Sequence, residues 1–134
     1  FKVHVNSQRD DLFISKPIFG RNSNKWSLQL TRRIIMPDDS FGGVAVVSLD
    51  PDYLAKFYES IDIGESGAVT LVGTDGIIRA RATKGSGGIG QSIANSSLFQ
   101  AYGHASSGVY SAKGQLDGVQ RLTAFAPSAT TRCW

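Results

Sequence analysis

The chain has 134 residues, a net charge of +3 and a single cysteine, Cys133, which excludes an internal disulfide. A chain of this size can bury a core, since folding removes about 70% of the surface of an unfolded chain of ~150 residues from water. No apolar stretch reaches the roughly 20 residues that span a bilayer, and no Cys/His spacing suits a metal site. The chain begins at Phe1 rather than Met, so we expect any anchor or leader to lie outside this sequence.

The first third of the chain predicts three consecutive antiparallel strands after a polar start that reads as a loop. Residues 12–19 are apolar but contain Pro17, which indicates an edge or bulged strand because proline cannot donate to a ladder. A turn cluster at 20–25 follows, and residues 26–35 then alternate between apolar and polar side chains, as half-buried strands do. Residues 42–49 are largely apolar and β-branched, which suits a central strand.

The next segment carries the strongest helix signals in the chain. Asp50 is a favourable N-cap, Pro51 suits the first helical position, and Asp52 favours the positive end of the helix dipole. Gly64 is the expected end. The apolar stripe of this amphipathic helix consists of Leu54, Phe57, Tyr58 and Ile61.

The second half predicts two hairpins separated by a short helix. Residues 68–82 form the first, because Asp-Gly between apolar runs favours a tight turn. A flexible loop at 84–92 leads to a short helix capped by Asn95 or Ser96, and residues 108–126 form the second hairpin. The predicted order is β-β-β-α-β-β-α-β-β, in which hairpins outnumber crossovers, so the fold class is α+β with an antiparallel, PAS-like sheet.

No common catalytic signature is present in the sequence. A serine nucleophile elbow is missing, and His4 and His104 are interpreted as surface residues. The glycines of the 84–92 loop have dinucleotide-fingerprint spacing but lack the strand–helix context that such binding needs. We therefore expect no catalytic site, no cofactor and no nucleic-acid partner. The nearest approach to a basic cluster is Arg79, Arg81 and Lys84.

Trp26, Arg32 and Asp50 are the candidate ligand-binding residues. Trp26 and Arg32 share the apolar face of the second predicted strand, where an arginine is costly unless it is paired. A guanidinium fork beside an aromatic wall suits a small anion, and Asp50 could take an amine. The ligand class is then a carboxylate or an amino-acid-like molecule. The alternative is that Arg32 reaches solvent at the sheet margin and Asp50 is only an N-cap.

The chain resembles the double-Cache extracytoplasmic sensor domains of bacteria. The segments that carry the resemblance are LFISKPIFGRNSNKWSLQLTRRI, DDSFGGVAVVSLDPDYLAKFY, IDIGESGAVTLVGTDGIIRAR, GQSIANSSLF and DGVQRLTAF. Such domains contain two PAS-like lobes and often precede a GGDEF diguanylate cyclase, a phosphodiesterase or a histidine kinase. The resemblance implies that residues 1–50 end a membrane-distal lobe, 51–66 form a linking helix, and 67–134 form an incomplete membrane-proximal lobe.

The function implied by this resemblance is extracytoplasmic ligand sensing. The chain would be the periplasmic part of an inner-membrane protein, with the membrane reached only through segments outside it. A bound ligand would favour one lobe arrangement and so bias a cytoplasmic output domain. The alternative is a non-binding spacer or dimerisation module of the same receptor. A truncated distal lobe would expose a sheet edge, so we also expect a homodimer.

Overall fold

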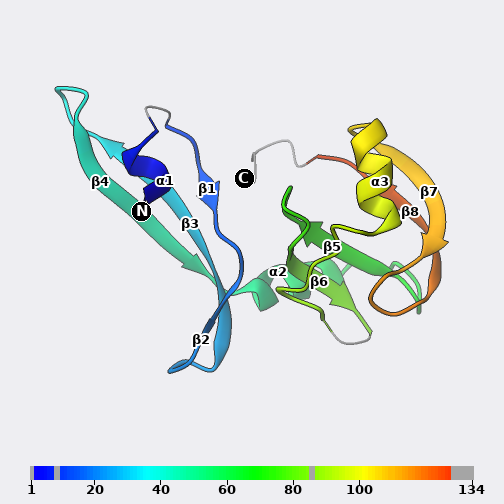
Figure 1. Ribbon diagram of the computed structural model, residues 1–134. Helices are drawn as coiled ribbons and strands as arrows, with labels where there is room; N and C mark the ends of the chain where they lie inside the picture. The colour runs from blue at the N-terminus through cyan, green and yellow to red at the C-terminus, as the bar shows by residue number, and fades with distance from the viewer. Residues whose placement is uncertain (1, 8–9, 85–86, 128–134) are drawn as a thin grey trace.

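The computed structural model describes residues 2–7, 10–84 and 87–127, which fold into the α+β arrangement of antiparallel strands and short helices expected from the sequence (Figure 1). The loop glycine Gly85 and the carboxyl-terminal residues 128–134, including Cys133, lie outside these ranges. The elements are α1 (Lys2–Val5), β1 (Phe13–Ile14), β2 (Ile18–Gly20), β3 (Lys25–Ile35), β4 (Phe41–Leu49), α2 (Pro51–Glu59), β5 (Ala68–Val72), β6 (Ile78–Thr83), α3 (Ser97–His104), β7 (Gly108–Lys113) and β8 (Gln120–Phe125).

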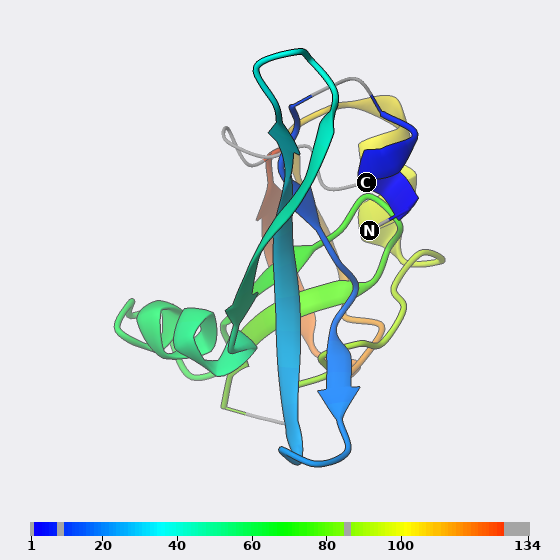
Figure 2. The same ribbon diagram turned by 90° about the vertical axis from the view of Figure 1, so that its left-hand side faces the viewer.

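The N-terminal lobe, residues 2–49, is a four-stranded antiparallel sheet centred on the long strand β3. The strands β1 and β2 pair with successive parts of β3, and β4 pairs with β3 over eight register positions (Figure 2). The apolar run at 12–19 is divided where Pro17 cannot donate to the ladder, and the Ser15 hydroxyl accepts the Gln29 N–H at 2.9 Å instead. The three predicted antiparallel strands are thus confirmed, the first of them in two pieces.

The polar start of the chain contains a short helix, α1, rather than the predicted loop. His4, which we interpreted as a surface residue, is buried, with its Nε2 2.7 Å from the Thr31 hydroxyl and its ring edge-on to Phe13. Arg33 also fixes this segment, because its Nη1 donates to the carbonyl oxygens of His4 and Ser7 at 2.7 Å. The interpretation of His4 failed because its hydrogen-bond partner, Thr31, lies 27 positions away on the polar face of β3.

The helix α2 begins as predicted and ends early. The Asp50 carboxylate accepts the Asp52 N–H at 2.9 Å, and Pro51 occupies the first turn and is buried. The helix stops at Glu59, short of the predicted Gly64, and Phe57 remains exposed. Only part of the predicted apolar stripe is therefore covered, where α2 packs against β6.

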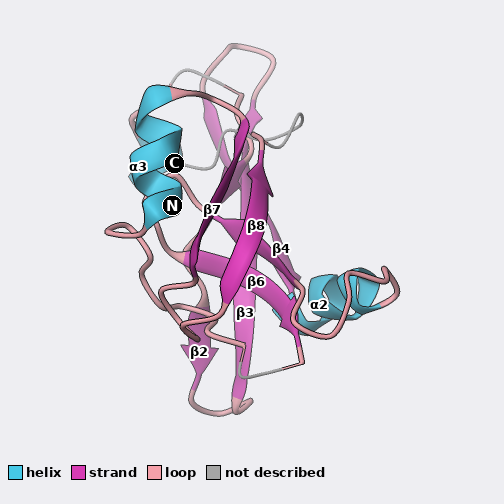
Figure 3. Ribbon diagram, turned by 90° about the vertical axis from the view of Figure 1, so that its right-hand side faces the viewer, coloured by secondary structure: helices cyan, strands magenta, loops and turns pink. Residues whose placement is uncertain are grey.

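The C-terminal lobe, residues 68–127, contains the two predicted hairpins, β5–β6 and β7–β8, with α3 beside them (Figure 3). The β5–β6 turn places Gly76 at φ +76°, which glycine tolerates without strain. Both Arg79 and Arg81 are buried on β6, so the basic cluster considered in the sequence is not a surface feature. The buried apolar residues of this lobe are Ile78, Ala80, Ala82 and Ile93.

Contacts between described residues of the two lobes include an ion pair and an aromatic packing contact. The Lys16 ammonium lies 3.8 Å from the Asp75 carboxylate in the β5–β6 turn. The Trp26 indole packs on the backbone of Gly90, so closely that a Cβ there would lie 3.1 Å from the ring. Gly90 has φ +79°, so glycine is needed at this contact for both space and conformation.

Candidate functional site

A large open cleft of about 1260 Å³ occupies the C-terminal lobe. Its lining comes mainly from the β5–β6 hairpin, from the amino-terminal turn of α3 and from the β7–β8 hairpin. Tyr58 of α2 and Leu12 of the N-terminal lobe also line it. The cleft exists because β5 pairs only with β6 and β8 pairs only with β7 among the described strands. Side chains from both lobes and from the connecting helix therefore meet at one site.

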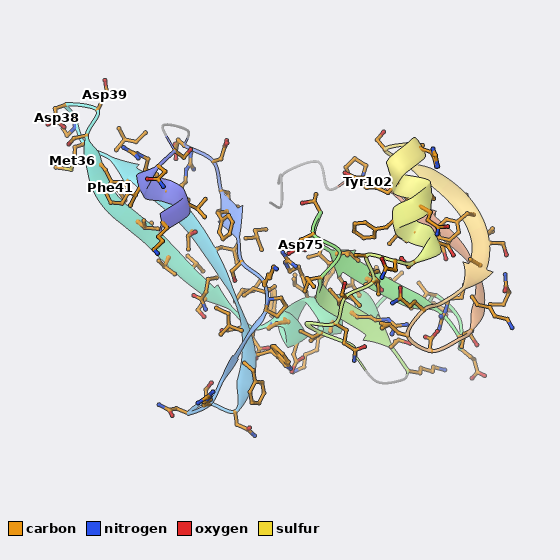
Figure 4. All side chains as sticks on the ribbon, viewed as in Figure 1. Met36, Asp38, Asp39, Phe41, Asp75 and Tyr102 are labelled. Carbon is orange, nitrogen blue, oxygen red and sulfur yellow. The ribbon has the colours of Figure 1, made fainter. Side chains whose placement is uncertain are left out.

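The walls of the cleft are mainly apolar and include two aromatic pairs. On α3 the rings of Phe99 and Tyr102 lie 6.2 Å apart, and on the last hairpin those of Tyr110 and Phe125 lie 6.1 Å apart (Figure 4 labels Tyr102). Both pairs have edge-to-face geometry, which aromatic rings prefer over direct stacking. Apolar walls with a few polar groups are the usual construction of a small-molecule site.

An ion-pair network of two arginines and one aspartate borders the cleft. The Arg81 Nη2 lies 2.7 Å from one Asp117 oxygen, and both Nη atoms of Arg121 lie within 2.9 Å of the same carboxylate. Hydrogen bonds from Arg121 and then Arg81 hold the pKa of Asp117 well below its ordinary value, although partial burial acts in the opposite direction. Arg121 also donates through Nε to the Ser66 carbonyl, so the network links β6, the last hairpin and the turn that precedes β5.

A second polar group in the cleft wall is Ser96, the N-cap of α3. Ser96 is one of the two caps predicted from the sequence, and its backbone has the extended conformation of an N-cap. Its hydroxyl, however, makes no capping hydrogen bond. That hydroxyl is sealed from solvent and has no hydrogen-bond partner in the described residues. Ser96 therefore fixes where α3 begins by its backbone rather than by its side chain.

The three candidate residues predicted from the sequence lie elsewhere, on the N-terminal lobe and its junction with α2. Trp26 packs edge-on against Phe19 at 5.2 Å. Arg32 is 60% exposed and forms a bidentate pair with Asp10, both bonds being 2.7 Å. Asp50 caps α2.

The same three residues do not meet at one point. Leu49 pairs with Leu28, so Asp50 follows near the Trp26 end of β3, whereas Arg32 pairs with Ala45. Arg32 lies six positions after Trp26, roughly 20 Å along β3. None of the three lines the cleft. Arg81, Asp117 and Arg121 were not predicted, because Arg81 and Asp117 lie 36 positions apart and no sequence pattern joins them.

The comparisons with known proteins agree with this fold. Residues 51–130 match the family described as dCache_1_like, histidine kinase sensor domain. The structure matches the extracellular domain of rpHK1S-Z16, described as a histidine kinase, with a TM-score of 0.85 and 28% identity over 98% of this chain. That match covers 54% of the other protein, so the chain spans about half of its length. A comparison with curated proteins gives no match.

The fold and the matches define a sensor domain of the PAS-like, Cache class. The chain belongs to the dCache_1-like family of histidine kinase sensor domains, which confirms the resemblance found in the sequence. Within the described residues, no helix is both long and apolar enough to cross a bilayer.

Proposed function

We propose that this chain is the extracytoplasmic ligand-sensing module of a bacterial membrane-bound signalling protein. It relays the binding of a small molecule to a cytoplasmic output domain, and any catalysis belongs to that domain. The family match and the likeness to an extracellular domain support this location and favour a histidine kinase output over a diguanylate cyclase.

The observation that carries the proposal is the position of the cleft. Tyr58 of the connecting helix and Leu12 of the N-terminal lobe line it together with residues of the C-terminal lobe. A ligand that contacts all three parts has a different affinity for each arrangement of them. Binding therefore shifts the population toward one arrangement, which is the requirement for relaying a signal.

A thermal-shift screen against amino acids, dicarboxylates and other small metabolites tests the sensing proposal. A ligand present at about 100 times its dissociation constant should add roughly 2.7 kcal/mol of apparent stability. The screen is repeated with Arg32→Ala, because Arg32 is the arginine predicted from the sequence to bind a carboxylate or amino-acid-like ligand. Trp26 and Asp50 lie toward the other end of β3, so the variant tests Arg32 by itself. A stability shift that the wild type shows and Arg32→Ala lacks would place the ligand at Arg32. A screen without any shift would favour a non-binding spacer.

The homodimer is a further part of the proposal, supported by the outer edge of β4. This strand pairs only with β3 among the described strands, it contains no charge or proline, and Val46 and Val47 are 57% and 62% exposed. Such an edge invites pairing with another strand. We expect light scattering to give twice the chain mass and Val47→Lys to reduce it. A wild-type monomer at all concentrations would contradict the dimer.

A further inference from the structure

The Arg81 side chain is buried but incompletely hydrogen bonded. It is 6% exposed and lines the cleft from β6, and Asp117 is its one hydrogen-bond partner in the described residues, through Nη2. Its Nε and Nη1 donate to no described group. The Nε of Arg79 is both sealed from solvent and without a hydrogen-bond partner, but neither of these two Arg81 atoms is in that state. The free donors of Arg81 are therefore accessible, and the accessible space beside this residue is the cleft.

Burial of a guanidinium with unused donors is costly, since this group carries five N–H donors and no acceptor. Asp117 cannot supply the missing bonds, because its two oxygens have about four acceptor sites and all are in use. They accept from both Nη atoms of Arg121, from Nη2 of Arg81 and from the Val119 N–H. One carboxylate thus serves two guanidiniums, which leaves one positive charge in excess. An anion in the cleft would satisfy both the charge and the donors of Arg81.

The other charged groups around the cleft also favour a negatively charged ligand. The charged side chains in its lining are three cations, Arg81, Lys113 and Arg121, and one acid, Asp11. The amino-terminal residues of α3, from Ser96 to Leu98, also line the cleft. An eight-residue helix presents the positive end of its dipole there, which adds to the attraction for an anion.

We propose that the cleft binds an organic carboxylate with an apolar, aromatic body. The carboxylate accepts from the N–H groups of Arg81 that Asp117 leaves free. The body packs against the aromatic pairs Phe99–Tyr102 and Tyr110–Phe125. This inference rests on the proposed sensing function and deepens it, because it names the chemical class of the ligand and the arginine that recognises it.

The test compares three probes that share one aromatic body: phenylacetate, phenylacetamide and 2-phenylethylamine. Titration calorimetry on the wild-type chain should show phenylacetate binding at least tenfold more tightly than the neutral amide or the cationic amine. Arg81→Gln should weaken phenylacetate binding roughly 10- to 100-fold, the usual weight of a hydrogen bond to a charged group, and leave the amide unchanged. Arg81→Lys, which keeps the charge but not the planar donors, should give an intermediate loss.

Arg21→Gln is the matched control, because it makes the same substitution at an exposed arginine outside the cleft and outside every proposed binding residue. Phenylacetate affinity should not change in it. Equal affinity for acid and amide, or wild-type binding by Arg81→Gln, would overturn the carboxylate assignment and leave ligand sensing intact. If none of the probes binds while the metabolite screen gives a hit, the inference alone fails. If neither experiment shows binding, the sensing proposal fails with it.

Discussion

Asp75→Ala should lower the free energy of unfolding by about 3 kcal/mol, because it leaves a buried arginine without its counter-charge. The Arg79 side chain is 0% exposed, and its Nη atoms lie 3.0 and 3.1 Å from the two Asp75 oxygens. Burial of Asp75 opposes its ionisation, but the hydrogen bonds from Arg79 and the Ile77 N–H prevail and hold the pKa of Asp75 below its ordinary value. Urea denaturation at neutral pH measures the loss.

Asp38→Ala is the control for the loss of a turn hydrogen bond, because Asp38 and Asp75 each accept one in their own turn. Each aspartate accepts the backbone N–H two residues on, Ser40 for Asp38 and Ile77 for Asp75, at 3.1 Å. Asp38 lies at the far tip of the β3–β4 hairpin, away from the junction of the lobes, whereas Asp75 faces the N-terminal lobe (Figure 4). We expect Asp38→Ala to cost well under half of what Asp75→Ala costs. Equal losses would mean that turn geometry, and not the buried charge, explains the effect.

A double variant separates the buried charge from the shape of the site. Replacing Arg79 with methionine in the Asp75→Ala background removes the unpaired charge and keeps a long side chain. Buried ion pairs exchanged for apolar residues of similar volume are often neutral in stability, so most of the loss should be recovered. The Nε of Arg79, sealed without a partner, makes recovery more favourable still. A double variant as unstable as Asp75→Ala would contradict this account.

The local elements of this fold were predictable because their signals are short-range. Asp50 and Pro51 mark the start of α2, and the turn residues Asp75 and Gly76 mark the β5–β6 hairpin. Period-2 alternation defined β3. The end of α2 was predicted too late, because the apolar stripe continues to Ile61 although the helix stops at Glu59. Pattern and capping both indicate helix here, and packing against β6 decides how much of it forms.

The candidate site was not predictable in the same way, because its residues meet only in the folded chain. Arg81 and Asp117 belong to different hairpins, and nothing near either residue indicates the other. Arg32 shows the opposite case: its strand face suggested a buried anion site, but Asp10 lies close enough to pair with it at the surface. Sequence patterns locate an arginine on a strand face, whereas its partner depends on where a distant loop lies.

Asp117→Asn should destabilise the chain by about 3 kcal/mol, because it removes the one carboxylate that two largely buried arginines share. Arg81 and Arg121 belong to different hairpins, and both bond to Asp117 at 2.7 to 2.9 Å. Asparagine keeps an acceptor for the Val119 N–H, so the β7–β8 turn itself should persist. Hydrogen exchange should therefore speed up most where the two hairpins meet. Protection equal to that of the wild type would contradict a linking role.

The pH dependence of stability provides a second and independent measure of this network. The pKa of Asp117 in the folded chain lies below its ordinary value of 3.8, so its contribution is complete above that value and is lost as the pH falls below it. Wild-type stability should therefore decrease between about pH 5 and pH 2, and the curve of Asp117→Asn should be shallower over the same range. Parallel curves would show that Asp117 is not the group responsible. Because Asp10, Asp38 and Asp75 also have lowered pKa values, the difference between the two curves, rather than the wild-type curve, isolates the Asp117 network.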